Sequence, residues 1–398
     1  MQIYEFFFNF AKDFAKKYKK HNRLMKFTVS SSALSGRLQT LNRVLSTKNT
    51  IQILDCILFQ LSHDELKLTA SDGEVTLETT LEVSDVEGSG VFAANALQVI
   101  NGLKEIAEQP VEMIINDSNY AVDIHYQNGT GKFMAQPGND YPEKQPIEGN
   151  VTILNLDSEV LQGGINHTLF ATADDELRPV MNGIYFDAQA DSLTFVASDG
   201  HKLVRDRSML VKTTNPTAFI LPKKPARTLK EILTKEEGEV EIKFDERRAE
   251  ISFESYVLSC RLIEGRYPAY NSVIPTDNPY HVNIERQSLI SALKRVLVFA
   301  SSSTSQVKLA VESGKLTVSA KDPDFNTEAR ESLACEYDGD PISIGFKGPF
   351  LIEILGCINA KEVVFELADP SRAGVIVPSE QENGNDLLML LMPMMLND

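Results

Sequence analysis

Serine, cysteine, histidine and aspartate are the residue types from which a catalytic or metal site could be built, and their spacing here favours neither. The six histidines are widely separated, and none forms the H-x-x-x-H spacing of zinc ligands on a helix. The four cysteines contain no C-x-x-C pair, and the nucleophile elbow G-x-S-x-G is absent. The two glycine-rich phosphate-binding motifs, G-x-x-x-x-G-K-(S/T) and G-x-G-x-x-G, are also absent. The sequence therefore predicts no catalytic residue, no metal and no cofactor.

Two Ser-Asp-Gly triplets are the places where an aspartate could still be catalytic. They centre on Asp72 and Asp199, and each follows an apolar run and precedes another. Asp-Gly between two such runs is a strong signal for a hairpin turn. We interpret both as turns, with a catalytic role as the alternative.

These turns belong to a threefold internal repeat. A similar strand and turn recurs around Asp322, so the three aspartates lie 127 and 123 residues apart. An amphipathic helix opens each repeat; in the first, Leu34, Leu38, Leu41 and Leu45 form an apolar stripe from which Arg43 points away. A second helix is expected after each turn, at residues 94–106, 222–233 and 347–358.

Strands with alternating apolar and polar residues complete each repeat, as antiparallel half-buried strands do. The fold class is therefore α+β, with three tandem copies of one domain. We expect an N-terminal extension followed by three domains, with these boundaries: 1–24, 25–149, 150–278 and 279–398.

Composition and charge narrow the class of protein. The chain has 398 residues, a formal net charge of −17 and 42% hydrophobic residues. This is typical of a globular protein of about two to four domains. The dispersed cysteines favour a reducing, cytoplasmic setting. No apolar run reaches the roughly 20 residues of a membrane helix, and even Leu387–Leu396 is interrupted by Pro393.

Residues 1–24 differ from the rest, with six Lys or Arg, two acids and several aromatic residues. Their positive charge follows the apolar residues, the reverse of the order in a signal peptide. Two interpretations stay open. The segment is either a basic amphipathic helix for a membrane or partner surface, or an accessory segment outside the fold that precedes Met25.

Two features fit less easily into a core or a solvated surface. The C-terminal string LLMLLMPMMLND is rich in Leu and Met, so it is either a last core strand or a soft apolar surface for partner peptides. Basic residues gather at 201–212 and 223–230 of this acidic chain. They form either a solvated face or a surface that follows phosphates.

Five segments in order then identify a resemblance. They are MKFTV (25–29), VASDGHKLV (196–204), LPKK (221–224), EGRYPAY (264–270) and LMPMML (391–396). From Met25 onward the chain resembles the bacterial DNA polymerase III beta subunit family, the beta sliding clamps. The resemblance implies a homodimer of three-domain subunits, with antiparallel sheets outside and two helices per domain inside. This six-domain ring encircles duplex DNA independently of its sequence.

The resemblance also implies contacts with DNA and with the second subunit. The implied DNA-facing residues are Lys48, Arg178, Lys223 and Lys224, and the implied dimer contacts are Phe133, Val298 and Phe299. The family often has a glutamine where this chain has Asp175, and an arginine near Asn95. We therefore leave these two positions out of the predicted DNA contacts.

Members of the family bind partner proteins in an apolar pocket between the second and third domains. Those partners are the polymerase III alpha subunit, the clamp loader, mismatch-repair proteins and others with a clamp-binding motif. The matching positions are Met181, Ser198, Gly200, His201, Lys202, Leu203, Pro268, Ser272, Val273, Leu390, Met392, Pro393, Met394, Met395 and Leu396. Ser272 and Met395 stand where basic residues are common, so the rim should be less basic here.

The resemblance thus implies a non-catalytic processivity factor of DNA replication. A nonreplicative scaffold that binds peptides without enclosing DNA is the alternative, and an enzyme would need a cluster of titratable groups that the sequence does not reveal.

Overall fold

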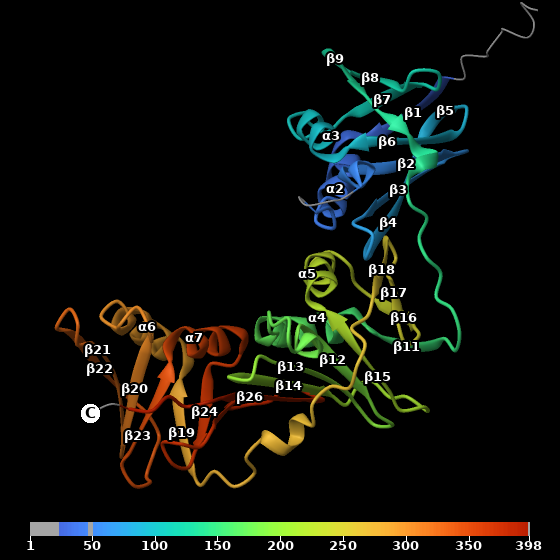
Figure 1. Cartoon of the computed structure of the whole chain (residues 1–398). Coiled ribbons are helices and arrows are strands. Elements are labelled where there is room, and N and C mark those ends of the chain that lie inside the picture. Colours follow the sequence, from blue (N-terminus) through green and yellow to red (C-terminus); the bar gives the residue numbers. More distant parts are fainter. Residues whose placement is uncertain (1–23, 47–50, 397–398) are drawn as a thin grey trace, which may run out of the picture. The chain divides into compact units, whose positions relative to one another are not determined.

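The computed structural model describes residues 24–46 and 51–396, which form two compact units. Unit 1 contains the described residues up to Pro146 together with Glu254–Ser259, and unit 2 contains Ile147–Phe253 with the described residues from Cys260 onward. In Figure 1 the chain runs from blue in unit 1 to red at the end of unit 2.

Unit 1 consists of two helices and antiparallel strands. One sheet has the order β5-β1-β7-β8-β9 and a second set of strands has the order β10-β6-β2-β3-β4. The first sheet comprises β1 (Leu24–Ser30), β5 (Ser84–Glu87), β7 (Pro110–Asn116), β8 (Ala121–Tyr126) and β9 (Gly129–Met134). The second comprises β2 (Cys56–Ser62), β3 (Glu65–Ser71), β4 (Val75–Glu82), β6 (Gly90–Asn95) and β10 (Gln136–Pro137). The helices are α2 (Ser31–Leu41) and α3 (Ala96–Leu103).

Helix α2 begins where the side chain of Ser30 accepts a hydrogen bond from the Ala33 N–H, at 3.1 Å. Leu34, Leu38 and Leu41 of the predicted stripe are fully buried, and Arg43 is exposed, as expected. Leu45 is the exception. The helix ends at Leu41, so the helical spacing no longer applies, and Val44 is the residue buried beyond it.

Unit 2 contains four helices and two complete antiparallel sheets, with orders β15-β12-β13-β14-β26-β25-β24-β19 and β22-β21-β20-β23. The strands of the eight-stranded sheet are β12 (Gly183–Ala188), β13 (Leu193–Ser198), β14 (Lys202–Ser208), β15 (Thr217–Pro222), β19 (Tyr280–Glu285), β24 (Glu362–Leu367), β25 (Gly374–Pro378) and β26 (Asn385–Leu391). The four-stranded sheet comprises β20 (Gln306–Glu312), β21 (Lys315–Asp322), β22 (Thr327–Ala334) and β23 (Ile342–Lys347).

A further ladder pairs β11 (Thr152–Asp157) with β16 (Glu239–Phe244), and β16 with β17 (Arg248–Ser252). Strand β18 (Tyr256–Arg261) follows, mostly within the residues of unit 1. The helices are α4 (Ser158–Thr168), α5 (Lys223–Ile232), α6 (Arg286–Leu297) and α7 (Gly348–Cys357). Within the described ranges each of the three repeats therefore has two helices, and the predicted second helices are confirmed with slightly shorter bounds.

The predicted hairpin turns are also confirmed. In the first repeat, one carboxylate oxygen of Asp72 accepts hydrogen bonds from the N–H groups of Glu74 and Val75, and Gly73 has a positive φ of 93°. This turn joins β3 to β4, and the corresponding turns join β13 to β14 and β21 to β22. The aspartates serve to close the turns.

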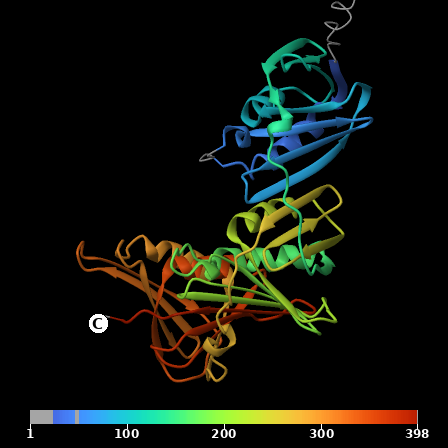
Figure 2. The same cartoon turned by 45° about the vertical axis from the view of Figure 1, so that its right-hand side comes forward.

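The eight-stranded sheet buries both of its faces. Val204 of β14 and Met389 of β26 belong to the core that includes residues of α6 and α7, whereas their neighbours Leu203 and Leu390 belong to a separate apolar cluster. Successive side chains of a strand point to opposite faces. Figures 1 and 2 show α4, α6 and α7 on one side of the unit 2 sheets, and the linker around residue 270 on the other side.

Candidate functional site

The apolar cluster on the sheet face away from the helices is the strongest candidate for a binding surface, and we call it the outer cluster. It unites residues from β13, β14, β15, β26 and the linker that follows β18. Its buried members are Val196, Leu203, Ile220, Tyr267, Tyr270, Ala373 and Leu390. Leu203 and Leu390, two of the residues predicted to line the pocket, form one pair of the β14–β26 register.

Tyrosines form part of this cluster, and the sequence-based list missed them. The rings of Tyr185 and Tyr267 are stacked with their centroids 4.7 Å apart. The hydroxyl of Tyr270 donates a hydrogen bond to a carboxylate oxygen of Asp187 at 3.1 Å. Burial, with the nearby charge of Asp187, raises the pKa of Tyr270 to about 12, so this phenol stays neutral. Both linker tyrosines flank the predicted Pro268 in the YPAY segment, which was the available signal.

The turn between β13 and β14 is fixed at one edge of the outer cluster. The Ser198 hydroxyl donates to the Lys202 carbonyl at 2.9 Å, and the Gly200 N–H donates to the Ser198 hydroxyl at 3.1 Å. Gly200 has a φ of +89°, and a Cβ there would lie 3.2 Å from a guanidinium nitrogen of Arg178. Glycine is required here both for its backbone and for the close approach of Arg178.

Asp199 holds this turn in place electrostatically. Burial by itself would raise its pKa, but hydrogen bonds from the backbone N–H groups of Lys202 and His201, and from the Lys202 ammonium group, outweigh burial and lower the pKa. The carboxylate form is therefore favoured in the folded protein.

We expect Asp199→Asn to lower the free energy of unfolding by about 2 kcal/mol at neutral pH, because a hydrogen-bonded charge is lost. A lowered pKa in the folded state stabilises the protein above the ordinary pKa of aspartate, and this contribution is lost as pH falls through the lowered value. Urea unfolding of the original protein and of the Asp199→Asn variant, at neutral and at acidic pH, measures this difference in the free energy of unfolding. A difference that persists unchanged in acid would contradict the role of the charge.

Lys202, which was predicted to line the peptide pocket, does not present its charge to the surface. Its residue is 4% exposed, and its ammonium group lies 2.9 Å from Asp199 and 3.4 Å from Glu353. The same nitrogen lies 3.8 Å from the ring centroid of Phe350. Lys202 therefore joins the β13–β14 turn to α7 instead of offering a partner a free cation.

The C-terminal string divides at Leu391. Met389 and Leu391 are buried in the core, so the first half is a core strand. Beyond it, Met392 and Met395 are exposed by 44% and 80%. The core-strand interpretation therefore holds up to Leu391, and the exposed methionines beyond it keep the peptide-surface interpretation as a prediction.

The exposed part of this string is held by its backbone. The Met392 N–H donates to the His201 carbonyl and the Met394 N–H donates to the Gly345 carbonyl, each at 2.8 Å. The Gln306 side-chain amide donates to the Met395 carbonyl, also at 2.8 Å. We call residues 392–396 the tail. Its methionine side chains are available to a ligand although its backbone is ordered by hydrogen bonds.

The remaining predicted pocket residues divide by exposure. Pro268, Ser272 and Val273 are exposed, and Val273 by as much as 58%. Met181 is buried. Pro393, Met394 and Leu396 of the tail are half-buried. The buried outer cluster suits a short apolar peptide, since exposed Val273 and Met392 follow its members Tyr270 and Leu390 closely in the chain.

Two of the four predicted DNA-facing cations already have carboxylate partners. The Lys223 ammonium lies 2.6 Å from Asp174, and the Nε of Arg178 lies 2.8 Å from Asp175. Lys224 is half-buried in the first turn of α5. Lys48 lies outside the described residues.

The predicted dimer contacts differ in exposure. Val298 and Phe299, just after α6, are exposed by 78% and 42%. Phe325 is 78% exposed, and the Thr327 hydroxyl donates to the Phe299 carbonyl at 3.3 Å, so the β21–β22 hairpin adjoins Phe299. Phe325 was not among the residues predicted from the sequence.

On the side of unit 1, the predicted contact Phe133 is largely covered by its own unit. This side chain is only 7% exposed, because it points into unit 1 from β9. The next residue, Met134, points the other way and is 58% exposed. Strand β9 ends its sheet, and Met134 is therefore the better candidate for an intersubunit contact.

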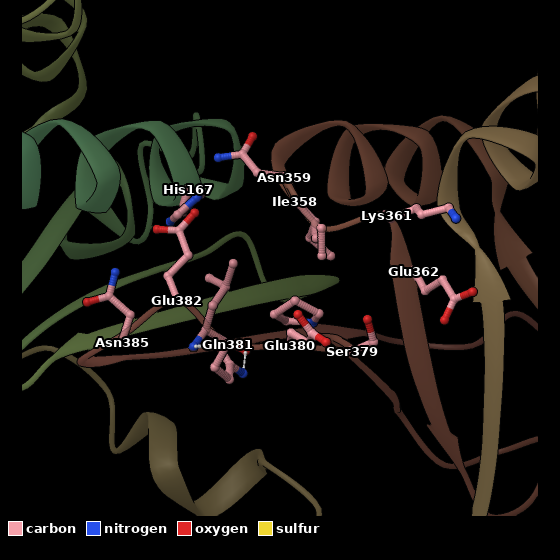
Figure 3. A pocket seen from close by; sticks show the side chains of 13 residues that line it. His167, Ile358, Asn359, Lys361, Glu362, Ser379, Glu380, Gln381, Glu382 and Asn385 are labelled. Carbon is pink, nitrogen blue, oxygen red and sulfur yellow. Dashed lines mark hydrogen bonds between the residues drawn. The ribbon is translucent and has the colours of Figure 1, made fainter.

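A separate cavity of about 470 Å³ lies beside the ends of α4 and α7. Figure 3 shows His167, Asn359 and Glu382 around it, with the Glu382 carboxylate directed toward His167. His167 is held by a 2.7 Å contact between its Nδ1 and Asp206. The lining of this cavity includes no residue that was predicted for the peptide pocket.

Two further observations concern metal ions and membranes. Over residues 24–46 and 51–396, no three His, Cys, Asp or Glu residues form a group that could hold a metal ion. Among the helices of the described chain, none is long and apolar enough to cross a membrane.

Family models for the DNA polymerase III beta subunit match all three repeats. The N-terminal domain model matches residues 25–145, the central domain model residues 155–269 and the C-terminal domain model residues 271–394. Beta sliding clamps are also similar over nearly their whole length. That of Pseudomonas putida is 26% identical, covering 94% of this chain and 100% of the relative, and that of Caulobacter vibrioides is 26% identical, covering 89% and 96%.

Solved structures agree with these matches. The Bartonella birtlesii sliding clamp bound to griselimycin has a TM-score of 0.86 and 27% identity, covering 94% of this chain and all of that one. A Pseudomonas aeruginosa sliding clamp with a ligand has a TM-score of 0.85 and 26% identity, with the same coverage. The chain therefore belongs to the DNA polymerase III beta subunit family, the sliding clamps, and is a processivity factor of DNA replication rather than a catalytic subunit.

Proposed function

We propose that the outer cluster and the tail form the site at which this clamp binds short apolar peptides of its partners. The observation that supports this most directly is the burial of Leu203 and Leu390 against the linker tyrosines. The exposed residue Met392 follows directly after the end of β26, the strand that contains Leu390. Flexible methionine side chains adapt to different peptides. The partners are the polymerase III alpha subunit, the clamp loader and other proteins with a clamp-binding motif.

Two subunits pair head to tail and enclose duplex DNA in a six-domain ring. A ring holds DNA by topology, so its phosphate contacts can be weak and independent of sequence. A net charge of −17 would oppose ordinary adsorption to DNA but does not oppose topological retention. Arg178, Lys223 and Lys224 are the proposed phosphate contacts among the described residues, and Lys48 is proposed from the sequence alone.

The proposed domain boundaries are 25–149, 150–278 and 279–398, and the proposed location is the cytoplasm. The matched ranges of the three family models fall within these boundaries except at residues 271–278, which the C-terminal model includes. The proposed second domain keeps η5 (Tyr270–Val273) with the tyrosine-rich linker to which it belongs.

A retention experiment tests the proposed function. The full chain is loaded onto nicked circular DNA by a clamp loader, and the amount bound is measured before and after the circle is linearised. A sliding ring stays on the circle and leaves the linear form through its ends. Equal retention on both forms would reject enclosure of DNA and favour a peptide-binding scaffold.

Phe299→Ala is expected to shift the dimer toward monomer. Truncation of a buried interface anchor typically costs more than 1 kcal/mol, which raises the dimer dissociation constant at least about fivefold. Sedimentation equilibrium over a dilution series measures this constant. Met134→Ala tests the opposite surface and should act in the same direction.

Leu97→Ala is a suitable control, because Leu97 is 59% exposed on α3 and is not part of the proposed interface. An unchanged dissociation constant for Phe299→Ala would remove Phe299 from the interface. If Phe299→Ala weakens the dimer and Met134→Ala does not, only the choice of Met134 over Phe133 as the contact in unit 1 is overturned.

A further inference from the structure

The Lys223 ammonium group is already occupied by a carboxylate of the same subunit. Its Nζ lies 2.6 Å from an oxygen of Asp174, which precedes it by 49 residues. The Lys223 side chain is 18% exposed, whereas the Asp174 side chain is 82% exposed. The lysine is thus largely covered, and its partner is the more exposed member of the pair.

The loop that bears Asp174 is fixed by its own hydrogen bonds. The Asp175 N–H donates to the Asn182 side-chain oxygen at 2.9 Å, and the Asn182 amide donates to the Asp175 carbonyl at 3.0 Å. Asp175 also accepts from the Leu177 N–H at 2.9 Å and from the Nε of Arg178 at 2.8 Å. The position of Asp174 beside Lys223 therefore follows from an ordered backbone.

Both carboxylates and cations line the hollow that this loop borders, whose volume is about 510 Å³. Its charged lining residues are Asp174, Asp175, Glu176, Asp199, Arg178, Lys202 and Lys223. Four carboxylates thus face three cations. The three cations each have a carboxylate partner, which is Asp175 for Arg178, Asp199 for Lys202 and Asp174 for Lys223.

We propose that Asp174 competes with DNA phosphates for Lys223 and so keeps the contact between clamp and DNA weak. This inference rests on the proposed function, because it assigns Lys223 to a phosphate. A phosphate that binds Lys223 must displace Asp174 or share the ammonium with it. Asp174 thereby sets how strongly a subunit holds the duplex, without contacting DNA itself.

The expected size follows from the exposure of the pair. An exposed ion pair contributes a modest free energy, equivalent to about two- to fivefold in an equilibrium constant. A phosphate contact made by a free lysine releases about 0.9 of a counterion from duplex DNA, whereas a neutral Asp–Lys pair releases less. Asp174 should therefore lower both the affinity for DNA and its dependence on salt.

The experiment compares Asp174→Asn with Glu176→Gln in the full-length dimer. Both substitutions remove one negative charge from the same loop, but Glu176 forms no ion pair with a lysine within the described residues and is exposed. Binding to a short labelled duplex is followed by fluorescence anisotropy over roughly 50 to 200 mM salt. We expect Asp174→Asn to bind about two- to fivefold more tightly at the lowest salt, with a salt slope steeper by up to about 0.9.

A second background isolates the competition. In Lys223→Gln, the additional change Asp174→Asn should give no more than the gain from Glu176→Gln, because no ammonium is left to release. If Asp174→Asn and Glu176→Gln raise the affinity for DNA equally in both backgrounds, the proposal is overturned. Asp174 then acts only through general electrostatic repulsion of DNA. Retention on circular DNA is measured in parallel and reports separately whether the ring encloses DNA. If no variant is retained, the clamp function is rejected, whereas the competition between Asp174 and phosphate is judged from the anisotropy data alone.

Discussion

A chain that ends at Leu391 is expected to lose at least about 100-fold in affinity for partner peptides, which corresponds to roughly 2.7 kcal/mol. The truncation removes Met392 and Met395, which are exposed, together with the half-buried rest of the tail. It leaves β26 and the buried Met389 in place, so the dimer and most of the thermal stability should remain. Fluorescence polarisation with a labelled clamp-binding peptide, together with a melting curve, measures both properties.

Two methionines three residues apart provide the matched control. Met389 is fully buried in the core, so Met389→Ala should cost about 2–5 kcal/mol of stability. Met392 is 44% exposed, so Met392→Ala should leave the melting temperature nearly unchanged and weaken peptide binding. If the truncated chain folds and binds the peptide as tightly as the full chain, the tail is not part of the site. Unfolding of the truncated chain would instead assign the tail to the core.

The repeat and its turns could be predicted because their causes are local. An aspartate that accepts hydrogen bonds from the next N–H groups closes a turn whatever surrounds it, as Asp72 and Asp199 do. The helices follow from apolar spacing in the same way. The end of α2 could not be predicted, because Leu45 fits the helical stripe although the structure buries Val44 instead.

The tail was ambiguous for a physical reason. Both faces of β26 are buried, one against the helices and one against the linker tyrosines, so the apolar run does not alternate. Nothing in the composition marks the point at which burial ends, which is Leu391. On β9, a one-residue difference decides whether Phe133 or Met134 points outward, and both are apolar.

Long-range charge pairs were beyond sequence reasoning. Lys202 is paired with Glu353, and Lys223 with Asp174, across separations that only the fold closes. A basic cluster in the sequence therefore overstated the free positive charge of this surface. The resemblance gave Arg178 and Lys223 as DNA-facing residues, but it did not reveal that both have intramolecular carboxylate partners.

Reversal of charge at Lys223 and Lys224 is expected to lower the affinity of the dimer for duplex DNA by more than about tenfold at low salt and to reduce the salt slope by roughly 1 to 2. Two lost phosphate contacts account for the slope, and two new carboxylates beside Asp174 add repulsion. The loss should be equal for duplexes of different sequence, because phosphate contacts contain no base information. Anisotropy titrations over a salt series measure both quantities.

The fold should tolerate Lys223→Glu with Lys224→Glu. These residues open α5, whose N-cap Pro222 provides no side-chain cap and whose first turn contains no acid. Carboxylates in the first turn stabilise a helix by about 0.3–1 kcal/mol through its macrodipole, which offsets the lost Lys223–Asp174 pair. A weakened binding to DNA therefore cannot be attributed to a melted helix if circular dichroism and the melting temperature are preserved.

The same change of charge placed elsewhere separates contact from general repulsion. Lys243 on β16 and Lys315 at the start of β21 are partly exposed lysines, each paired with a nearby glutamate. Lys243→Glu with Lys315→Glu matches the change of net charge, and it should lower the affinity only slightly and leave the salt slope intact. Equal losses in the two double variants would show that Lys223 and Lys224 are merely part of a solvated surface, and the assignment of α5 to the DNA-facing side would then be wrong.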